Sequence, residues 1–229
     1  MKETRKIKAV LFDFDGTLVK LNVDFPAMRE AVLDLIVSYN VQSDGIGNLF
    51  ALEMIEAGRE LISRLGRNRE SEYLAMAYGI VRRFEMEGAK EGVLIEGVKE
   101  MLAETKRRGI KAGVVTRNCR DAVGAIFPDI VEYCGAVITR EDTERVKPHP
   151  DHLRTALRAL KTSAPGAIMV GDHPMDIRAG RSIGAFTVGV LTGYSEKEDL
   201  VRAGADLVIS SAAALVSRFD ESGISTTCQ

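Results

Sequence analysis

Hydrophobic residues are spaced in two different ways along the chain, and the spacing divides it into three parts. Residues 7–14 form a short apolar run that stops at an Asp-Gly-Thr turn, a pattern typical of a buried strand. Between Pro26 and about Ala89, apolar residues recur at helical spacing, which predicts three or four helices and no strand. From Gly92 onward, short apolar runs alternate with helical segments.

This last part has the alternation expected of a parallel sheet covered on both faces. Strands are predicted at Ala112–Thr116, Ala136–Ile138, Ala167–Gly171, Phe186–Val190 and Leu207–Ile209, and helices at about 97–108, 119–126, 150–160, 175–183, 196–203 and 211–219. Because the first strand precedes the helical stretch, we expect an α/β core of residues 1–20 and 90–229 with a helical domain of residues 21–89 inserted into it.

Smaller features predict where elements end. The triplet Gly66-Arg67-Asn68 is expected to separate two helices of the inserted stretch. Gly88 and Gly92 are expected to make the return connection to the core a hinge. The polar tail Glu221–Gln229 is expected to be loose.

Composition narrows the class of protein. With 45% hydrophobic and 28% charged residues and only 6 prolines, the chain is expected to be globular. A net charge of −2 provides no general field for nucleic acid. The 3 cysteines lack the spacing of a disulfide framework or a zinc site. Without an apolar run long enough for a bilayer or a signal peptide, we expect a cytoplasmic protein with no membrane partner.

Carboxylates follow two of the predicted strands. Asp13 and Asp15 come directly after the first strand, and Asp172 and Asp176 follow the strand Ala167–Gly171. Ligands of open α/β sheets bind at such strand ends. Closely spaced carboxylates repel unless a cation or a shared proton intervenes, so the two clusters indicate a metal site. A calcium-binding EF-hand loop does not fit, because its glycine and final glutamate positions are not matched.

Two further polar segments could bind an anion. Thr116, Arg117 and Asn118 end another strand and precede a helix, where backbone amides and the helix dipole favour negative charge. Lys147 lies in a proline-flanked stretch directly before a helix. Each of these segments, taken alone, commonly has only a structural role. Only their combination indicates a functional site.

The ordered set Asp-x-Asp-Gly-Thr, then Thr, then Lys-Pro, then Gly-Asp-x-x-x-Asp resembles the haloacid dehalogenase (HAD) superfamily over about residues 7–210. The resemblance is to subfamily I members with a phosphoglycolate-phosphatase-like cap, and it implies a Rossmann-like core, bound Mg²⁺ and an inserted helical cap. It implies Asp13 as nucleophile, Asp15 as general acid/base, and Thr116 and Lys147 as phosphate binders. Asp13, Asp15 and Asp172 would hold the metal, with Asp176 in support.

Chemical reasoning reaches the same roles. A phosphate ester is cleaved more easily in two steps through an aspartyl-phosphate, for which Asp13 would be the nucleophile. Oxygen-ligated Mg²⁺ and the ammonium of Lys147 would neutralise charge, and Thr116 would donate its hydroxyl. Gly16 would allow close backbone approach to the phosphate, with Arg117 and Asn118 as further binders.

Several alternatives stay open on the sequence. Dehalogenation needs neither Asp15 nor the later acidic pair, and a phosphonatase needs a cap lysine that residues 21–89 lack. A phosphomutase and a catalytically silent binding module with the same fold remain possible. A dinucleotide-dependent oxidoreductase would rest on Gly45-Ile46-Gly47, which lacks a third glycine and does not follow a strand.

The substrate expected is a small phosphorylated metabolite, and the protein is expected to be a monomer or homodimer. The helical insertion usually selects the leaving group. Its arginines are more simply read as a solvated surface, and His173 as a turn residue that could touch substrate. The arginines in question are Arg59, Arg64, Arg67 and Arg69.

Overall fold

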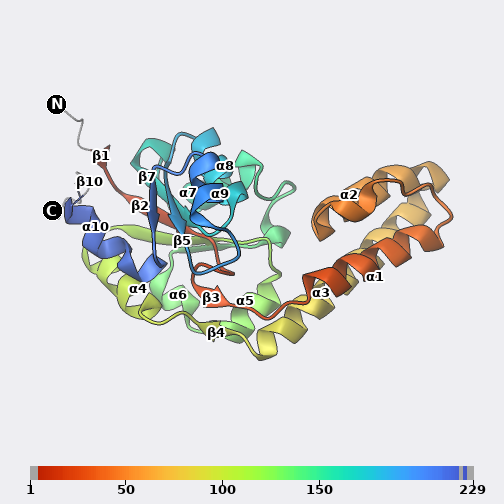
Figure 1. Cartoon of the computed structure of the whole chain (residues 1–229), viewed down its shortest axis with the longest axis horizontal. Coiled ribbons are helices and arrows are strands. Elements are labelled where there is room, and N and C mark those ends of the chain that lie inside the picture. The colour runs from red at the N-terminus through yellow and green to blue at the C-terminus, as the bar shows by residue number, and fades with distance from the viewer. Residues whose placement is uncertain (1–4, 222–223, 226–229) are drawn as a thin grey trace. The chain divides into compact units, whose positions relative to one another are not determined.

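A six-stranded parallel sheet is the largest sheet of the computed structural model, which describes residues 5–221 and 224–225 (Figure 1). Its strands are β2 (Ala9–Phe12), β5 (Lys111–Val115), β6 (Ala136–Ile138), β7 (Ala167–Gly171), β8 (Phe186–Val190) and β9 (Leu207–Ile209). Their order in the sheet is β6-β5-β2-β7-β8-β9. The chain therefore starts in the middle of the sheet and fills first one side of β2 and then the other. The carboxyl ends next to such a reversal are where open α/β sheets bind ligands.

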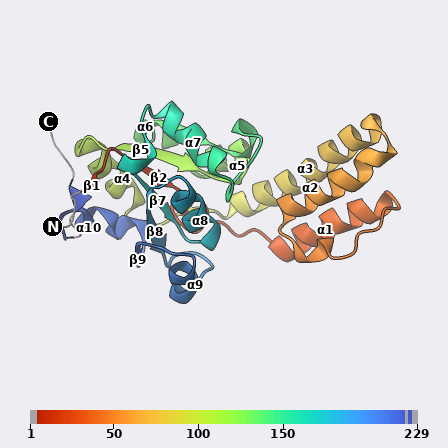
Figure 2. The same cartoon turned by 90° about the horizontal axis from the view of Figure 1, so that it is seen from above.

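Helices cover both faces of this sheet, which confirms the predicted α/β fold (Figures 1 and 2). They are α4 (Val98–Arg107), α5 (Arg120–Ile126), α6 (Ile130–Tyr133), α7 (Pro150–Ala159), α8 (Pro174–Ser182), α9 (Lys197–Arg202) and α10 (Leu215–Glu221), with short 3₁₀ turns η3 (Arg140–Asp142), η4 (Ala164–Gly166) and η5 (Ala212–Ala214). Helices α7 and α8 pack together over one face, and α4 packs on β5 and against α10.

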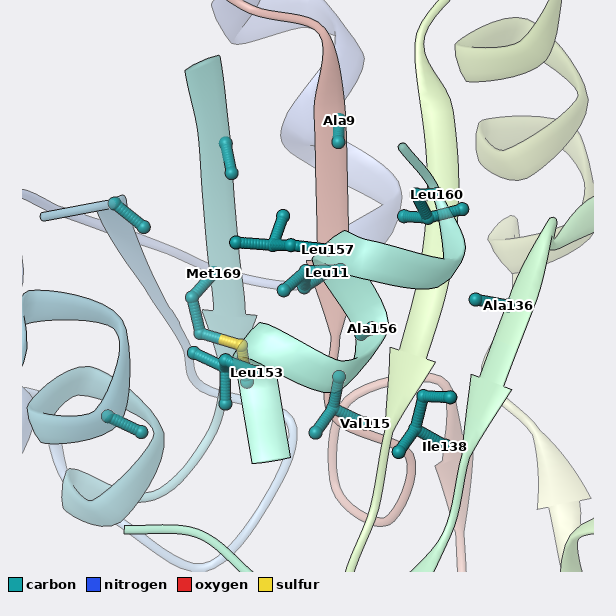
Figure 3. Close-up of a cluster of buried hydrophobic side chains, with 13 residues drawn as sticks. Ala9, Leu11, Val115, Ala136, Ile138, Leu153, Ala156, Leu157, Leu160 and Met169 are labelled. Carbon is teal, nitrogen blue, oxygen red and sulfur yellow. The ribbon is translucent and has the colours of Figure 1, made fainter. Parts of the chain in front are cut away.

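The central strands are apolar throughout because both of their faces are buried. All four residues of β2 are fully buried. Ala9 and Leu11 belong to the cluster that α7 covers through Leu153 and Leu157 (Figure 3). Since side chains alternate across a strand, Val10 and Phe12 face the opposite side of the sheet. Burial on both faces fixes the position of β2 within the sheet. The position of the polar residues that follow β2 is therefore fixed as well.

Two short strand pairs lie outside the main sheet. β3 (Val19–Lys20) pairs antiparallel with β4 (Val93–Leu94). β1 (Arg5–Lys6) pairs parallel with β10 (Ile224–Ser225). The expectation of a loose tail is therefore wrong for these two tail residues, whose backbone is held by pairing with the start of the chain. The rest of the tail after Glu221, including Cys228, lies outside the described residues.

The chain divides into two units, a core unit made of Met1–Leu21 and Gly92–Gln229, and a helical unit made of Asn22–Glu91. Three or four helices were expected in the helical unit, which has three α-helices and, within its described residues, no strand. Its elements are α1 (Phe25–Ser38), η1 (Ile46–Asn48), α2 (Ala51–Ile62), η2 (Ser63–Leu65) and α3 (Arg67–Lys90). Helix α1 begins with an N-cap, in which the Asp24 side chain accepts a hydrogen bond from the Ala27 amide.

Two details of the helical unit differ from the sequence-based expectations. Gly66 alone ends the helical path, with φ at 113°, and α3 starts at Arg67, so Arg67 and Asn68 are not part of a loop. Gly88 lies inside α3, where an added Cβ would come within 2.7 Å of Val23 Cγ2. Gly88 therefore serves close packing within a helix and not a flexible connection. No helix of the described residues is both long and apolar enough to cross a membrane.

Candidate active site

The candidate site lies at the carboxyl ends of three neighbouring strands. The backbone ladder continues one residue past two of them: the Asp13 amide donates to the Val170 carbonyl at 2.8 Å, and the Thr116 amide to the Ile138 carbonyl at 2.9 Å. Asp172 follows the last residue of β7. The backbone of Asp13 and Thr116 is thus held by hydrogen bonds to neighbouring strands. Because β2 lies between β5 and β7, the three strand ends are adjacent.

Three carboxylates gather at this edge of the sheet. Asp13, Asp172 and Asp176 each offer an oxygen, and these oxygens lie within 4.8 Å of one another. Asp176 is supplied by the first turn of α8, and both Asp172 and Asp176 are buried. An added Cβ at Gly171 would overlap the Asp176 side chain, so the glycine at the end of β7 makes room for this carboxylate.

Lys147 brings a positive charge to the cluster. Its side chain is fully buried, and its Nζ lies 2.6 Å from Asp13 Oδ1 and 2.7 Å from Asp176 Oδ1. Burial alone would lower the pKa of Lys147, but the two carboxylates outweigh it and the pKa is raised. Lys147 is therefore a permanent cation that connects the strand end of β2 with the start of α8.

One ammonium does not balance three carboxylates, and the remaining charge changes their protonation. Burial raises the pKa of Asp13 to about 6; Lys147 opposes this shift and the Asp176 carboxylate adds to it. Burial, followed by the charges of Asp13 and Asp176, raises the pKa of Asp172 to about 8. Both shifts have the cause expected where buried like charges face one another.

These residues fit a small divalent cation. Oxygen donors, mainly carboxylates, are what Mg²⁺ prefers in proteins. A cation among Asp13, Asp172 and Asp176 would offset the burial and the like-charge repulsion that together raise the pKa values of Asp13 and Asp172. The donor set and the excess negative charge therefore both favour such an ion.

Asp15 lies in the same turn but not in the carboxylate cluster. Its Oδ1 accepts a hydrogen bond from the Leu21 amide at 3.1 Å, and its backbone forms a bridge with Val19. The turn closes with the Gly16 amide donating to the Val19 carbonyl at 2.8 Å. Gly16 has φ at 73°, a left-handed conformation that favours glycine.

The segment after β5 is bound to its neighbours in several ways. The Thr116 side chain is buried, and its Oγ1 accepts from the Asn118 amide at 3.1 Å, which leaves the hydroxyl proton available for donation. Arg117 Nη1 lies 3.1 Å from the Met175 sulfur, while Arg140 donates to the Arg117 carbonyl at 3.0 Å. Arg117 is thereby directed toward the start of α8.

Two histidines have structural contacts near the site. His173 caps α8: its Nδ1 accepts from the Met175 amide at 3.1 Å, and burial lowers its pKa. His152, in the first turn of α7, is fully buried, and its Nδ1 accepts from the Lys147 amide at 3.1 Å. Burial and the charge of Lys147 lower the pKa of His152 to about 3. His152 therefore supports the backbone of Lys147, a contact that the sequence reading did not predict.

The sequence reading also missed the loop after β8. Thr192 and Tyr194 form hydrogen bonds with Gly16 and Asp172. The signal was present, because this loop follows the carboxyl end of a predicted strand, as the acidic segments do.

Comparisons with known proteins found related sequences and similar folds. The sequence profile of the haloacid dehalogenase-like hydrolase family matches residues 10–190. Pyrophosphatase PpaX of Bacillus cereus is 34% identical over 188 residues, which cover 81% of this chain and 83% of the relative. A structure described as a predicted phosphoglycolate phosphatase from Haemophilus somnus matches with a TM-score of 0.63 at 20% identity, covering 93% of this chain and 97% of the other. β-Phosphoglucomutase from Clostridium difficile matches with a TM-score of 0.66 at 17% identity, covering 95% and 96%.

Proposed function

The chain belongs to the haloacid dehalogenase-like hydrolase family, and from this we propose that it is a Mg²⁺-dependent phosphatase acting through an aspartyl-phosphate. The observation that carries the proposal is the cluster of Asp13, Asp172 and Asp176 with Lys147 at the carboxyl ends of β2 and β7. A phosphate group has the charge and oxygen atoms that such a set of an ammonium and a metal-binding pocket recognises.

Asp13 is the proposed nucleophile. One of its carboxylate oxygens forms a bond to phosphorus while the bond from phosphorus to the leaving oxygen breaks, which gives an acyl phosphate on Asp13. Lys147, at 2.6 Å from Asp13 Oδ1, orients this carboxylate and balances its charge. Thr116 and the backbone around Gly16 would bind the phosphoryl oxygens, with Arg117 and Asn118 next to them.

Asp15 is the proposed general acid and base. It would give a proton to the leaving oxygen and then take one from the water that attacks the acyl phosphate. The water oxygen bonds to phosphorus while the bond from phosphorus to the Asp13 oxygen breaks, which releases inorganic phosphate and returns both side chains to their starting state. The Leu21 amide donates a hydrogen bond to Asp15 Oδ1 at 3.1 Å, which helps to fix the orientation of this carboxyl group in the turn. Asp15 is two residues from Asp13 in the same turn, which places acid and nucleophile on one segment.

Mg²⁺ would be held by the carboxylates of Asp13 and Asp172, with Asp176 in support and Asp15 contributing from the turn. When bound, the ion supplies positive charge that lowers the repulsion between the carboxylate nucleophile and the phosphate. Asp172 would then be ionised in the loaded protein, because the cation offsets the burial and the neighbouring charges that raise its pKa.

The substrate is proposed to be a small phosphorylated compound, and the helical unit is proposed to act as the cap that selects it. A phosphoric monoester is the first candidate. Inorganic pyrophosphate is the second, because relatives at 30–34% identity are named pyrophosphatase. Transfer to a second position of the same sugar is the third, because a solved structure of the same fold is a β-phosphoglucomutase.

A panel assay separates these candidates. The purified protein is incubated with phosphorylated acids, sugar phosphates, p-nitrophenyl phosphate and pyrophosphate, and released inorganic phosphate is measured with Mg²⁺ and with EDTA. We expect turnover only with Mg²⁺ and almost none for Asp13→Asn, since an amide is a poor nucleophile. Isomerised sugar phosphate without phosphate release, seen by ³¹P NMR, would indicate a mutase. No turnover of any compound, or equal turnover by Asp13→Asn, would contradict the proposal.

A further inference from the structure

The loop after β8 forms hydrogen bonds with both acidic segments of the site. The Thr192 hydroxyl donates to the Gly16 carbonyl at 2.6 Å. Two residues later, the Tyr194 amide donates to Asp172 Oδ2 at 3.2 Å. The loop itself is anchored to the sheet, because the Leu191 amide donates to the Ile209 carbonyl at 3.2 Å. It thus connects the Asp13 turn and Asp172 to a strand that carries neither.

Gly193, between these two donors, lies against the Asp172 carboxylate. An added Cβ at Gly193 would overlap Asp172 Cγ and Oδ2, and one at Gly16 would come within 2.6 Å of Asp172 Cγ. Gly193 is not among the glycines with positive φ, so its backbone conformation would accept alanine. What this position requires is the space that the missing side chain leaves for the carboxylate.

We propose that Thr192, Gly193 and Tyr194 are positioning residues for the phosphatase reaction, an inference that rests on the proposed function. The Tyr194 amide and the open space at Gly193 fix the orientation of Asp172, and the Thr192 hydroxyl fixes the peptide of Gly16 in the turn that carries Asp13 and Asp15. Groups that orient metal-binding carboxylates and catalytic loops from outside the site commonly change metal affinity or activity by 10- to 100-fold when removed.

Metal binding tests the Gly193 contact without any substrate. Mg²⁺ alone is titrated by calorimetry into the wild-type protein, Gly193→Ala and the matched control Gly124→Ala, whose added Cβ would meet nothing within 4 Å. We expect the dissociation constant for Mg²⁺ to rise about tenfold or more for Gly193→Ala and to stay within about twofold for Gly124→Ala. Wild-type Mg²⁺ affinity in Gly193→Ala would overturn the inference for Asp172.

Turnover of p-nitrophenyl phosphate tests Thr192. Thr192→Val removes the hydroxyl, Thr192→Ser keeps it, and Thr105→Val removes a comparable hydroxyl that donates to the Met101 carbonyl in α4. We expect kcat to fall about tenfold for Thr192→Val with KM nearly unchanged, to recover in Thr192→Ser, and to stay at the wild-type value in Thr105→Val. Equal kcat in wild type and Thr192→Val would overturn the inference.

The two failures can be told apart. If the wild-type protein releases no phosphate from any compound, the proposed function fails, whereas an active wild type with unaffected Thr192→Val and Gly193→Ala variants refutes only the positioning role. Should Gly193→Ala fail to fold, the Thr192 series decides alone.

Discussion

Acid should destabilise the core unit through His152, and the size of the effect follows from one buried hydrogen bond. His152 Nδ1 accepts from the Lys147 amide, so the neutral ring carries its proton on Nε2. Protonation of Nδ1 would break this bond and place a charge beside Lys147. This agrees with a folded-state pKa of about 3, against an ordinary value of 6.5.

The sign and magnitude follow from linkage. Between pH 6.5 and about 3, the unfolded chain binds one more proton at His152 than the folded one, so the contribution of His152 to the free energy of unfolding falls as the pH falls. The slope is about 1.4 kcal/mol per pH unit, or about 2 kcal/mol lost at pH 5. The full contribution is present above pH 6.5.

The assay compares unfolding by urea in EDTA at several values between pH 7 and pH 5. The chain has no tryptophan, so circular dichroism is the suitable signal. His152→Asn keeps an acceptor oxygen near the position of Nδ1 but cannot titrate. The difference in free energy of unfolding between wild type and His152→Asn should therefore shift by about 2 kcal/mol, against the wild type, from pH 7 to pH 5, because the buried carboxylates Asp13 and Asp172 titrate in both proteins. Thr105→Val loses a buried hydrogen bond without losing a titratable group, so its deficit should be constant. Parallel profiles for wild type and His152→Asn would refute the reasoning.

Three further predictions concern other parts of the chain. Asp15→Asn should lower kcat/KM for an alkyl phosphate by about 10² to 10⁴ and kcat/KM for p-nitrophenyl phosphate far less, because kcat/KM reports formation of the acyl phosphate and only the poor leaving group needs a proton in that step; equal losses in kcat/KM would contradict the acid role. Lys147→Met should lower the free energy of unfolding in EDTA by about 3–5 kcal/mol, since it leaves buried carboxylates without their cation. Lys99→Met removes a solvent-screened pair with Asp129 and should have a much smaller effect in the same urea measurement. Gly58→Ala should destabilise the helical unit by about 1–3 kcal/mol because the added Cβ would overlap the Tyr73 hydroxyl, while Gly79→Ala, in open space, should not lower the melting temperature.

The sequence predicted the main sheet because each buried strand is an apolar run closed by polar residues or glycine. The bounds of β6 (Ala136–Ile138), β7, β8 and β9 agree with the prediction to the residue. The β1 and β10 pair was not predictable, since two residues on each side carry no periodicity and the partners lie at opposite ends of the chain. Gly66 was read as part of a three-residue break because propensity does not show where a helix resumes.

Site residues were predictable from the sequence where they directly follow the end of a predicted strand. Asp13, Thr116 and Asp172 follow strand ends, and the topology places those ends side by side. The contact of Lys147 with Asp13 joins residues 134 positions apart, so only tertiary structure brings them together. Asp176, in contrast, was expected beside Asp172 because it follows the same strand, and α8 turns it back over Gly171 into the carboxylate cluster.

The place of β2 in the sheet has a consequence for synthesis on the ribosome. β2 is the first strand of the main sheet to be synthesised. Its neighbours β5 and β7 begin only at Lys111 and Ala167, so they are synthesised much later. The helical unit, in contrast, is contiguous in sequence and can fold as soon as Glu91 has left the exit tunnel. A nascent chain that stops before β7 therefore carries a fully apolar strand with one edge unpaired, the kind of edge that aggregates. We therefore expect the nascent chain to depend most on chaperones after β5 has been synthesised and before β7 has been.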